Sequence, residues 1–283
     1  MTAYTLTLSC ADRPGLVAEV ATLIAKCGGN IIEASQFNDP QSRRFFMRLS
    51  FDLDPHAEPR FTGLFGPQAV AAEMAWTLHD ANRRRRVLIL VSTFDHCLGD
   101  LLYRQRIGEL SMDIVGIASN HPRQSMNLLG LVGLPFHYLP LTPDTRAEQE
   151  AQIKALVADT RAELVVLARY MQILSDDLAQ FMTGRCINIH HSFLPGFKGA
   201  KPYHQAHARG VKMIGATAHY VTGDLDEGPI IHQDVESISH ADSPDDLVRK
   251  GRDIERRVLA RAVQLHLEDR VVLNGTRTVV FEK

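Results

Sequence analysis

Residues 164–190, LVVLARYMQILSDDLAQFMTGRCINIH, contain the pattern that decides the fold of the longer part of this chain. The apolar runs at 164–168 and 186–189 are typical of strands that are buried on both faces of a parallel sheet. Between them, residues 176–182 have a helical pattern. The order strand, helix, strand predicts a βαβ unit, the building block of a doubly wound α/β sheet.

The same kinds of segment recur on both sides of this unit. Further strands and helices are predicted at 87–91, 98–107, 114–118, 146–159, 216–221, 244–267 and 279–281. We therefore expect residues 86–283 to form a doubly wound, mostly parallel α/β domain.

Residues 1–82 have a different organisation. Strands and helices alternate over short distances, with strands predicted at 4–9, 31–37, 45–51 and 75–78 and helices at 16–27 and 61–73. The order βαββαβ predicts a small α+β domain, and residues 79–86 read as the linker to the second domain.

The composition is that of an ordinary globular protein and excludes several classes. The 283 residues are 45% hydrophobic and 23% charged, with a net charge of -2, so neither nucleic acid nor an anionic membrane is an expected partner. The four cysteines are scattered, as expected of free thiols in a reducing cytoplasm. The chain begins without the pattern of a signal peptide and has no apolar run of membrane-spanning length. We expect a soluble cytoplasmic protein.

Two polar side chains stand where the strand at 186–189 ends. Asn188 and His190 are two residues apart, so they share one face of an extended strand, and His191 does not. Ligands of doubly wound sheets bind at the carboxyl ends of the strands. An Asn here is either a turn residue that bonds its own backbone or a donor to an oxyanion, and a His is a proton carrier.

The loop at 223–229 supplies a candidate carboxylate. Asp226 can orient or deprotonate water, and its neighbour Asp224 is the control for that choice. Such acidic loops are often solvated surface, and this one lacks the full ligand series of an EF-hand. His219, on the strand at 216–221, is either a packing residue or a binding group near the same pocket.

Histidines are frequent in this half of the chain, and their spacing raises the question of zinc. His204 and His207 could form a pair of ligands, but no third ligand follows with the spacing of a structural site. We therefore expect no metal.

The pattern N-x-H-x-S-x-L-P from Asn188, followed by H-x-V-x-x-x-x-D-x-G-P-I-I from His219, resembles the folate-dependent formyltransferase superfamily. The form His190-His191-Ser192 is similar to that of its formyltetrahydrofolate deformylases, and Gly199-Ala200-Lys201 and the segment 251–255 add to the resemblance. The resemblance implies that Asn188, His190 and Asp226 are catalytic. It further implies that folate is bound by Met171, Gln172, Ile173, Leu174, His219, Val221, Thr222 and Gly223.

The nucleophile is the open question for such a site. In the glycinamide ribonucleotide formyltransferases of the superfamily, a glycine-rich first turn holds the phosphate of the acceptor. Here residues 92–99 have no glycine before Gly99, and Asp95 would repel a phosphate. Water remains as the nucleophile. The resemblance then implies hydrolysis of 10-formyltetrahydrofolate, which supplies formate and balances the folate pools used in purine synthesis. A formyltransferase to a small amine and a folate or amino-acid sensor without catalysis are the alternatives.

The first domain resembles the ACT domains. The segments D-R-P-G-L-V at 12–17 and G-G-N-I-I at 28–32 carry this resemblance. It implies an amino-acid effector such as glycine or methionine, bound by Asp12, Arg13, Pro14, Gly15 and Asn30, and a homo-oligomer. A dimerisation module without a ligand is the alternative. No cofactor is expected beside the folate substrate.

Overall fold

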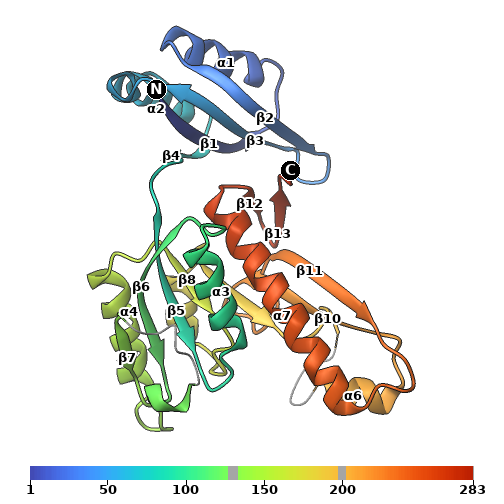
Figure 1. Ribbon diagram of the computed structural model, residues 1–283. Coiled ribbons are helices and arrows are strands. Elements are labelled where there is room, and N and C mark those ends of the chain that lie inside the picture. Colours follow the sequence, from blue (N-terminus) through green and yellow to red (C-terminus); the bar gives the residue numbers. More distant parts are fainter. Residues whose placement is uncertain (127–132, 197–201, 283) are drawn as a thin grey trace. The chain divides into compact units, whose positions relative to one another are not determined.

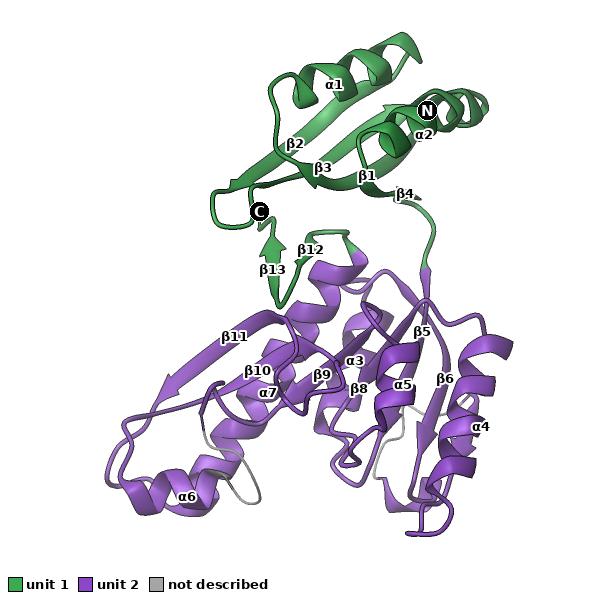
Figure 2. Ribbon diagram, turned by 180° about the vertical axis from the view of Figure 1, so that it is seen from behind, with its two compact units in different colours: residues 1–84, 268–283 green, residues 85–267 purple. Residues whose placement is uncertain are grey.

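The computed structural model describes residues 1–126, 133–196 and 202–282, and the motif Gly199-Ala200-Lys201 lies outside them. The chain forms two compact units, residues 1–84 with 268–283, and residues 85–267 (Figure 2). Within the described ranges, no helix has both the length and the apolar character needed to cross a membrane.

The first unit is built on an antiparallel sheet. Its elements are β1 (Thr2–Ala11), α1 (Leu16–Lys26), β2 (Asn30–Asp39), β3 (Arg44–Leu53), a 3-10 turn (Pro55–Ala57), α2 (Glu58–Ala71) and β4 (Ala75–Asp80). The strand order is β2-β3-β1-β4, which confirms the predicted βαββαβ arrangement. The helices cover one face of this sheet, where Leu6 and Leu8 of β1 and Met47 and Leu49 of β3 join their apolar side chains in one core (Figure 1).

The C-terminal segment belongs to this first unit. After residue 267 the chain forms the hairpin β12 (Val271–Asn274) and β13 (Arg277–Val280). Arg270 is 1% exposed and donates to both carboxylate oxygens of Glu33 on β2, each at 3.1 Å. Arg48 of β3 donates to the backbone oxygen of Glu268 at 3.0 Å.

The predicted boundary, which placed residues 86–283 in one domain, is therefore corrected for residues 268–283. The physical reason is that the buried guanidinium of Arg48 on β3 needs more than its ion pair with Glu33, and the backbone oxygen of Glu268 supplies the further acceptor. The linker also differs from its prediction at 79–86. Strand β4 continues to Asp80, paired with Tyr4, and the next strand begins at Arg85.

The second unit is a mixed sheet with helices on both faces. Its strands are β5 (Arg85–Val91), β6 (Met112–Ser119), β7 (Phe136–Tyr138), β8 (Leu164–Leu167), β9 (Cys186–His190), β10 (Met213–Tyr220) and β11 (Ile230–Ser237). Its helices are α3 (His96–Arg106), α4 (Arg146–Asp159), α5 (Asp176–Phe181), α6 (Pro202–Arg209) and α7 (Pro244–Leu267), with a 3-10 turn at Arg123–Ser125.

The strand order, β11-β10-β9-β8-β5-β6-β7, confirms the doubly wound sheet. The strands from β9 to β7 in this order are parallel, and β10 and β11 extend the sheet antiparallel beside β9. Helices α3 and α7 lie on one face and α4 and α5 on the other (Figures 1 and 2). The direction of winding reverses between β5 and β8, and in open α/β sheets the crevice beyond such a reversal binds ligands.

Candidate active site

Asn188 and His190 lie on β9, and register brings a third polar side chain beside them. His219 of β10 pairs directly with Asn188 across the antiparallel ladder. Nδ2 of Asn188 lies 3.3 Å from Nε2 of His219, although the two residues are far apart in sequence. Nδ1–H of His219 donates to the backbone oxygen of Tyr220 at 2.9 Å, so in the neutral ring Nε2 is the acceptor and the Asn188 amide the donor.

Asp226 reaches these side chains from the loop after β10. Its Oδ2 lies 3.2 Å from Nδ1 of His190, and its Oδ1 lies 3.8 Å from Nε2 of His219. Burial by itself would raise the pKa of Asp226, but the neighbouring His190 and, less directly, His219 outweigh it and hold that pKa well below its usual range. The carboxylate is therefore ionised wherever the protein is folded at ordinary pH.

The backbone around Asp226 is unusual and holds the carboxylate in place. Asp226 has φ +57°, a left-handed conformation that Asp tolerates better than most residues. Two residues later, a side chain at Gly228 would place its Cβ 1.7 Å from the backbone oxygen of Tyr220. Only glycine allows this approach, and the carbonyl it packs against is the one that orients His219.

His190 is fixed on one side and open on the other. It is 6% exposed, and Asp226 contacts its Nδ1. Its Nε2 is buried and has no hydrogen-bond partner among the residues described here. Because a buried polar atom without a partner is costly, Nε2 is the atom most suited to a bound ligand.

These side chains line a cavity of about 330 Å³. It brings together the sequence-predicted residues Asn188, His190, Asp226, Met171, Gln172, Ile173, Leu174, His219, Val221, Thr222 and Gly223. The loop from Met171 is tied to the end of β5, because Ser92 Oγ accepts from the Met171 backbone N–H at 3.0 Å. The apolar side chains of Met171, Ile173 and Leu174 thus share the cavity with the polar groups of β9 and β10.

Arg169, Tyr170, His191 and Asp224 also line the cavity. Arg169 and Tyr170 begin the segment that the resemblance matches to a folate-binding loop, whereas His191 and Asp224 were given no role from the sequence. His191 reaches the cavity because β9 ends at His190, so the alternation of faces no longer applies. Burial, followed by the charges of Arg169 and His190, lowers the pKa of His191 to about 4. His191 is therefore neutral near pH 7.

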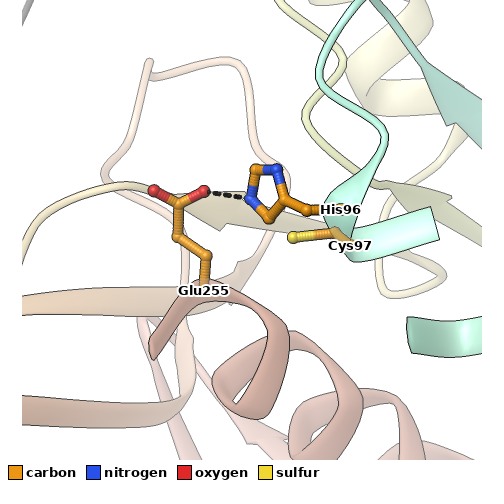
Figure 3. A group of neighbouring side chains, drawn as sticks. All are labelled: His96, Cys97 and Glu255. Atoms are coloured by element: carbon orange, nitrogen blue, oxygen red, sulfur yellow. Dashed lines mark hydrogen bonds and ion pairs between the residues drawn. The ribbon is translucent and has the colours of Figure 1, made fainter. Parts of the chain in front are cut away.

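A buried polar cluster adjoins the cavity at Arg169. Glu255 of α7 is 1% exposed and accepts from the Tyr203 hydroxyl at 2.7 Å. His96, at the start of α3, contacts the other Glu255 oxygen at 2.8 Å (Figure 3), and Arg169 Nε lies 3.3 Å from that same oxygen. A carboxylate on the apolar stripe of a long helix was the sequence signal that could have revealed this cluster.

The same cluster contains the group of metal-ligand side chains found within the described ranges. The ligand atoms of His96, Cys97 and Glu255 lie within 4.8 Å of one another (Figure 3). Burial raises the pKa of the Cys97 thiol well above its usual value, and Glu255 is already bound by protein donors. This donor set fits a polar network better than a metal. His204 and His207, the zinc candidates of the sequence, are not part of it.

The structure does not bring the predicted effector residues of the first unit together. Both terminal nitrogens of Arg13 donate to Glu19 at 2.6 Å, and Asp12 accepts from Asn38 at 2.8 Å. Pro14 and Gly15 are exposed in the same loop before α1, where Gly15 has φ +91°. Asn30 starts β2 opposite Asp52, at the other end of the sheet.

A hollow of about 600 Å³ also lies in this unit, between α1 and α2. It is lined by Arg13, Ala18, Glu19, Thr22, Leu23, Lys26, Gln68, Ala71 and Ala72. Among the predicted effector residues, Arg13 alone lines it.

Comparison with known proteins gives two domain matches. Residues 85–263 match the formyl transferase family and residues 4–57 match the ACT domain. A formyltetrahydrofolate deformylase of Corynebacterium sp. is 48% identical over 280 residues, covering 98% of both chains.

Solved structures agree with this result. A formyltetrahydrofolate deformylase from Burkholderia mallei has a TM-score of 0.95 and 52% identity, with 100% of both chains covered. A glycinamide ribonucleotide transformylase from Symbiobacterium toebii has a TM-score of 0.64 and 28% identity, covering 70% of this chain and 95% of that one. The transformylase likeness thus spans only part of this chain, whereas the deformylase likeness spans all of it.

Proposed function

This chain belongs to the formyltetrahydrofolate deformylase family, and we propose that it hydrolyses 10-formyltetrahydrofolate to formate and tetrahydrofolate. The observation that carries the proposal is the pairing of Asp226 with His190 Nδ1, which leaves the buried His190 Nε2 for the substrate. The balanced reaction consumes one water and releases formate, a proton and the N10 amine.

In the proposed first step, Asp226 orients a water molecule against the formyl carbon. The water oxygen forms a bond to this carbon, the C=O electron pair moves onto the formyl oxygen, and Asp226 receives the water proton. A carboxylate with a lowered pKa is a weak base at rest. Because His190 contributes to that lowering, the main task of Asp226 before attack is to orient the water, and the water proton passes to Asp226 as the O–C bond forms.

Asn188 and His190 have the complementary task in the proposal. The second N–H of the Asn188 amide and protonated His190 Nε2 donate to the oxyanion of the tetrahedral intermediate. One such donor typically stabilises a transition state by about 3–4 kcal/mol. His219 fixes the orientation of Asn188 through their contact at 3.3 Å and need not itself change protonation.

Collapse of the intermediate completes the reaction. The C–N10 bond breaks, its electron pair returns to nitrogen, and N10 takes a proton from His190 directly or through water. Formic acid loses its remaining proton to solvent, which leaves formate. His190 regains its proton from Asp226, so both groups return to their starting states.

The structure offers support for water over a phosphate-bearing amine as the nucleophile. The turn between β5 and α3 keeps Asp95 directly before the helix and has no glycine before Gly99. Such a turn does not provide the close backbone approach that a phosphate-bearing acceptor requires.

For the ACT unit we propose regulation by a small amino acid. The purine role, the cytoplasmic location and the homo-oligomer stay predictions.

The deciding experiment is formate release from 10-formyltetrahydrofolate by the purified protein with a chelator present and water as the sole acceptor. Stoichiometric formate and tetrahydrofolate are expected. Repeating the assay with glycine or methionine tests the proposed regulation. If the folate binds but formate is released only after a small amine is added, the hydrolase proposal is wrong and the transferase alternative replaces it.

A further inference from the structure

Arg169 is a buried cation at the wall of the cavity, and the proposed mechanism does not use it. Its side chain is 10% exposed, and it lines the same cavity as His190 and Asp226. Its backbone has φ +63°, a left-handed conformation that is uncommon for a residue with a long side chain. The tertiary structure therefore holds Arg169 at this position against its local preference.

The Nε atom of Arg169 has a charged neighbour but no hydrogen bond to it. Glu255 lies 3.3 Å from Nε, but the geometry there is not that of a hydrogen bond, and Nε is buried without a hydrogen-bond partner in the described part of the chain. The ring of Phe94 lies 5.6 Å from Cζ and covers the guanidinium. The side chain is thus held by a carboxylate and an aromatic face at the wall of the cavity, and among the described residues its Nε–H has no acceptor in hydrogen-bond geometry.

The charges around this position favour an anion. Glu255 is shared with His96 and the Tyr203 hydroxyl, so a single carboxylate faces several donors. Burial and then the positive charge of Arg169 lower the pKa of His191. The ring centroid of His191 lies 5.1 Å from that of His190. Arg169 thus lies near His191, which is next to the residue that would contact the formyl group.

We infer that Arg169 forms a subsite for a small carboxylate, and that this carboxylate is the formate produced in the proposed reaction. This inference rests on the proposed function. The planar guanidinium matches the two oxygens of formate with two parallel N–H···O bonds. Asp226, an anion in the same cavity, repels formate, so Arg169 offsets this repulsion as the second oxygen acquires charge.

The substrate carries carboxylates of its own in the glutamate tail of the folate. These carboxylates are the alternative ligand for the Arg169 guanidinium. The position of Arg169 favours formate. Arg169 is nine-tenths buried and lies beside the histidines of the reacting end, whereas the glutamate tail is at the opposite end of the folate from the group transferred.

The test measures formate binding directly. Sodium [13C]formate is titrated, by NMR line broadening, into the full chain saturated with tetrahydrofolate, with sodium chloride keeping the ionic strength constant. Arg169→Met should weaken formate binding at least tenfold. Arg169→Lys keeps the charge but not the two parallel N–H donors, and it should weaken formate binding at least threefold. Arg249→Met, which removes a guanidinium that is 74% exposed on α7, should leave formate binding unchanged.

The KM for 10-formyltetrahydrofolate distinguishes formate from the glutamate tail of the folate as the ligand of Arg169. It should change less than threefold in Arg169→Lys if formate is the ligand. A raised KM with unchanged formate binding would assign Arg169 to the glutamate tail and overturn the inference. If Arg169→Met does not fold, the Lys variant decides, and wild-type affinity for formate in that variant refutes the subsite. The assay of wild-type turnover is separate, so failure of the proposed hydrolysis is recognised independently.

Discussion

The two regions that the sequence marked as ligand sites behave differently in the structure. In the second unit, side chains from the segments 171–174, 188–190 and 219–226 line one cavity. In the first unit, the residues from Asp12 to Gly15 stay in one loop, and Asn30 lies at the far end of the sheet. Both sets came from sequence resemblance of the same kind.

The difference shows that a sheet brings residues that are distant in the sequence together, whereas a single loop does not. Hydrogen-bonded strands hold residues from distant parts of the sequence side by side, in a register that the ladder fixes. The pairing of Asn188 with His219 is a direct result of strand register. A loop motif has no such constraint, and in this unit its charged groups pair with near neighbours such as Glu19 and Asn38.

The largest effect that should follow from this contrast is at Asp226. Asp226→Asn is expected to lower kcat for formate release by roughly 10²–10⁴-fold, because the carboxylate that orients water and pairs with His190 is lost. The KM should change little. Asp224→Asn, on the same loop and also at the cavity wall, is the matched control and should stay active. Retention of most turnover by Asp226→Asn would remove this residue from the proposed mechanism.

The second prediction concerns the C-terminal segment in the first unit. Arg270→Met should destabilise this unit by about 2–3 kcal/mol, since Glu33 and the backbone oxygen of Phe281 lose a buried donor. Trp76, the single tryptophan, packs on Phe65 at 5.0 Å between ring centroids, so its fluorescence reports the unfolding of this unit in urea. An unchanged fluorescence midpoint would show that the segment does not stabilise the sheet.

The third prediction tests the loop that carries Asp226. Gly228→Ala should reduce kcat by on the order of 10²-fold, because relief of the 1.7 Å contact must move the Tyr220 carbonyl or the loop itself. Gly66→Ala, on α2 of the first unit, is the control, since its Cβ would meet no atom within 4 Å. Similar activities for the two variants would mean that the position of this loop is not critical.

The fourth prediction uses the pKa of His191, which is lowered to about 4. Between pH 4 and about 6.5 the unfolded chain binds a proton at this residue and the folded chain does not, so stability rises with pH and is lost as pH falls. His191→Gln should remove about 1–3 kcal/mol of this acid destabilisation. The measurement is urea unfolding of both proteins at pH 7 and pH 4.5. Parallel pH profiles would contradict the assignment.

The smallest effect is expected in the loop of the first unit. Arg13→Met removes an ion pair with Glu19 whose side chains are 44% and 46% exposed, so stability should change by less than about 1 kcal/mol. Urea unfolding followed by Trp76 measures this change, and the variant also serves as the surface control for Arg270→Met. If Arg13→Met abolishes an effect of glycine or methionine on formate release, the loop is an effector site despite this pairing.

Much of this protein follows from its sequence alone. The order of strands and helices in both units was predictable because hydrophobic period and turn residues are local signals. The shared face of Asn188 and His190 follows from the alternation of a strand, which depends on nothing distant. The choice of Asp226 over Asp224 required the resemblance to a family, because two acids in one loop look alike in the sequence.

Other features were decided only by the tertiary structure. The partners of Arg169, Glu255 and Arg270 come from distant segments, and whether a charged residue is buried depends on what those segments place around it. The C-terminal segment could not be assigned to the first unit from its sequence, since the need to cover Arg48 is a property of the folded sheet. Local periodicity fixed the elements and the face of each side chain, and the packing of remote segments fixed which charges meet.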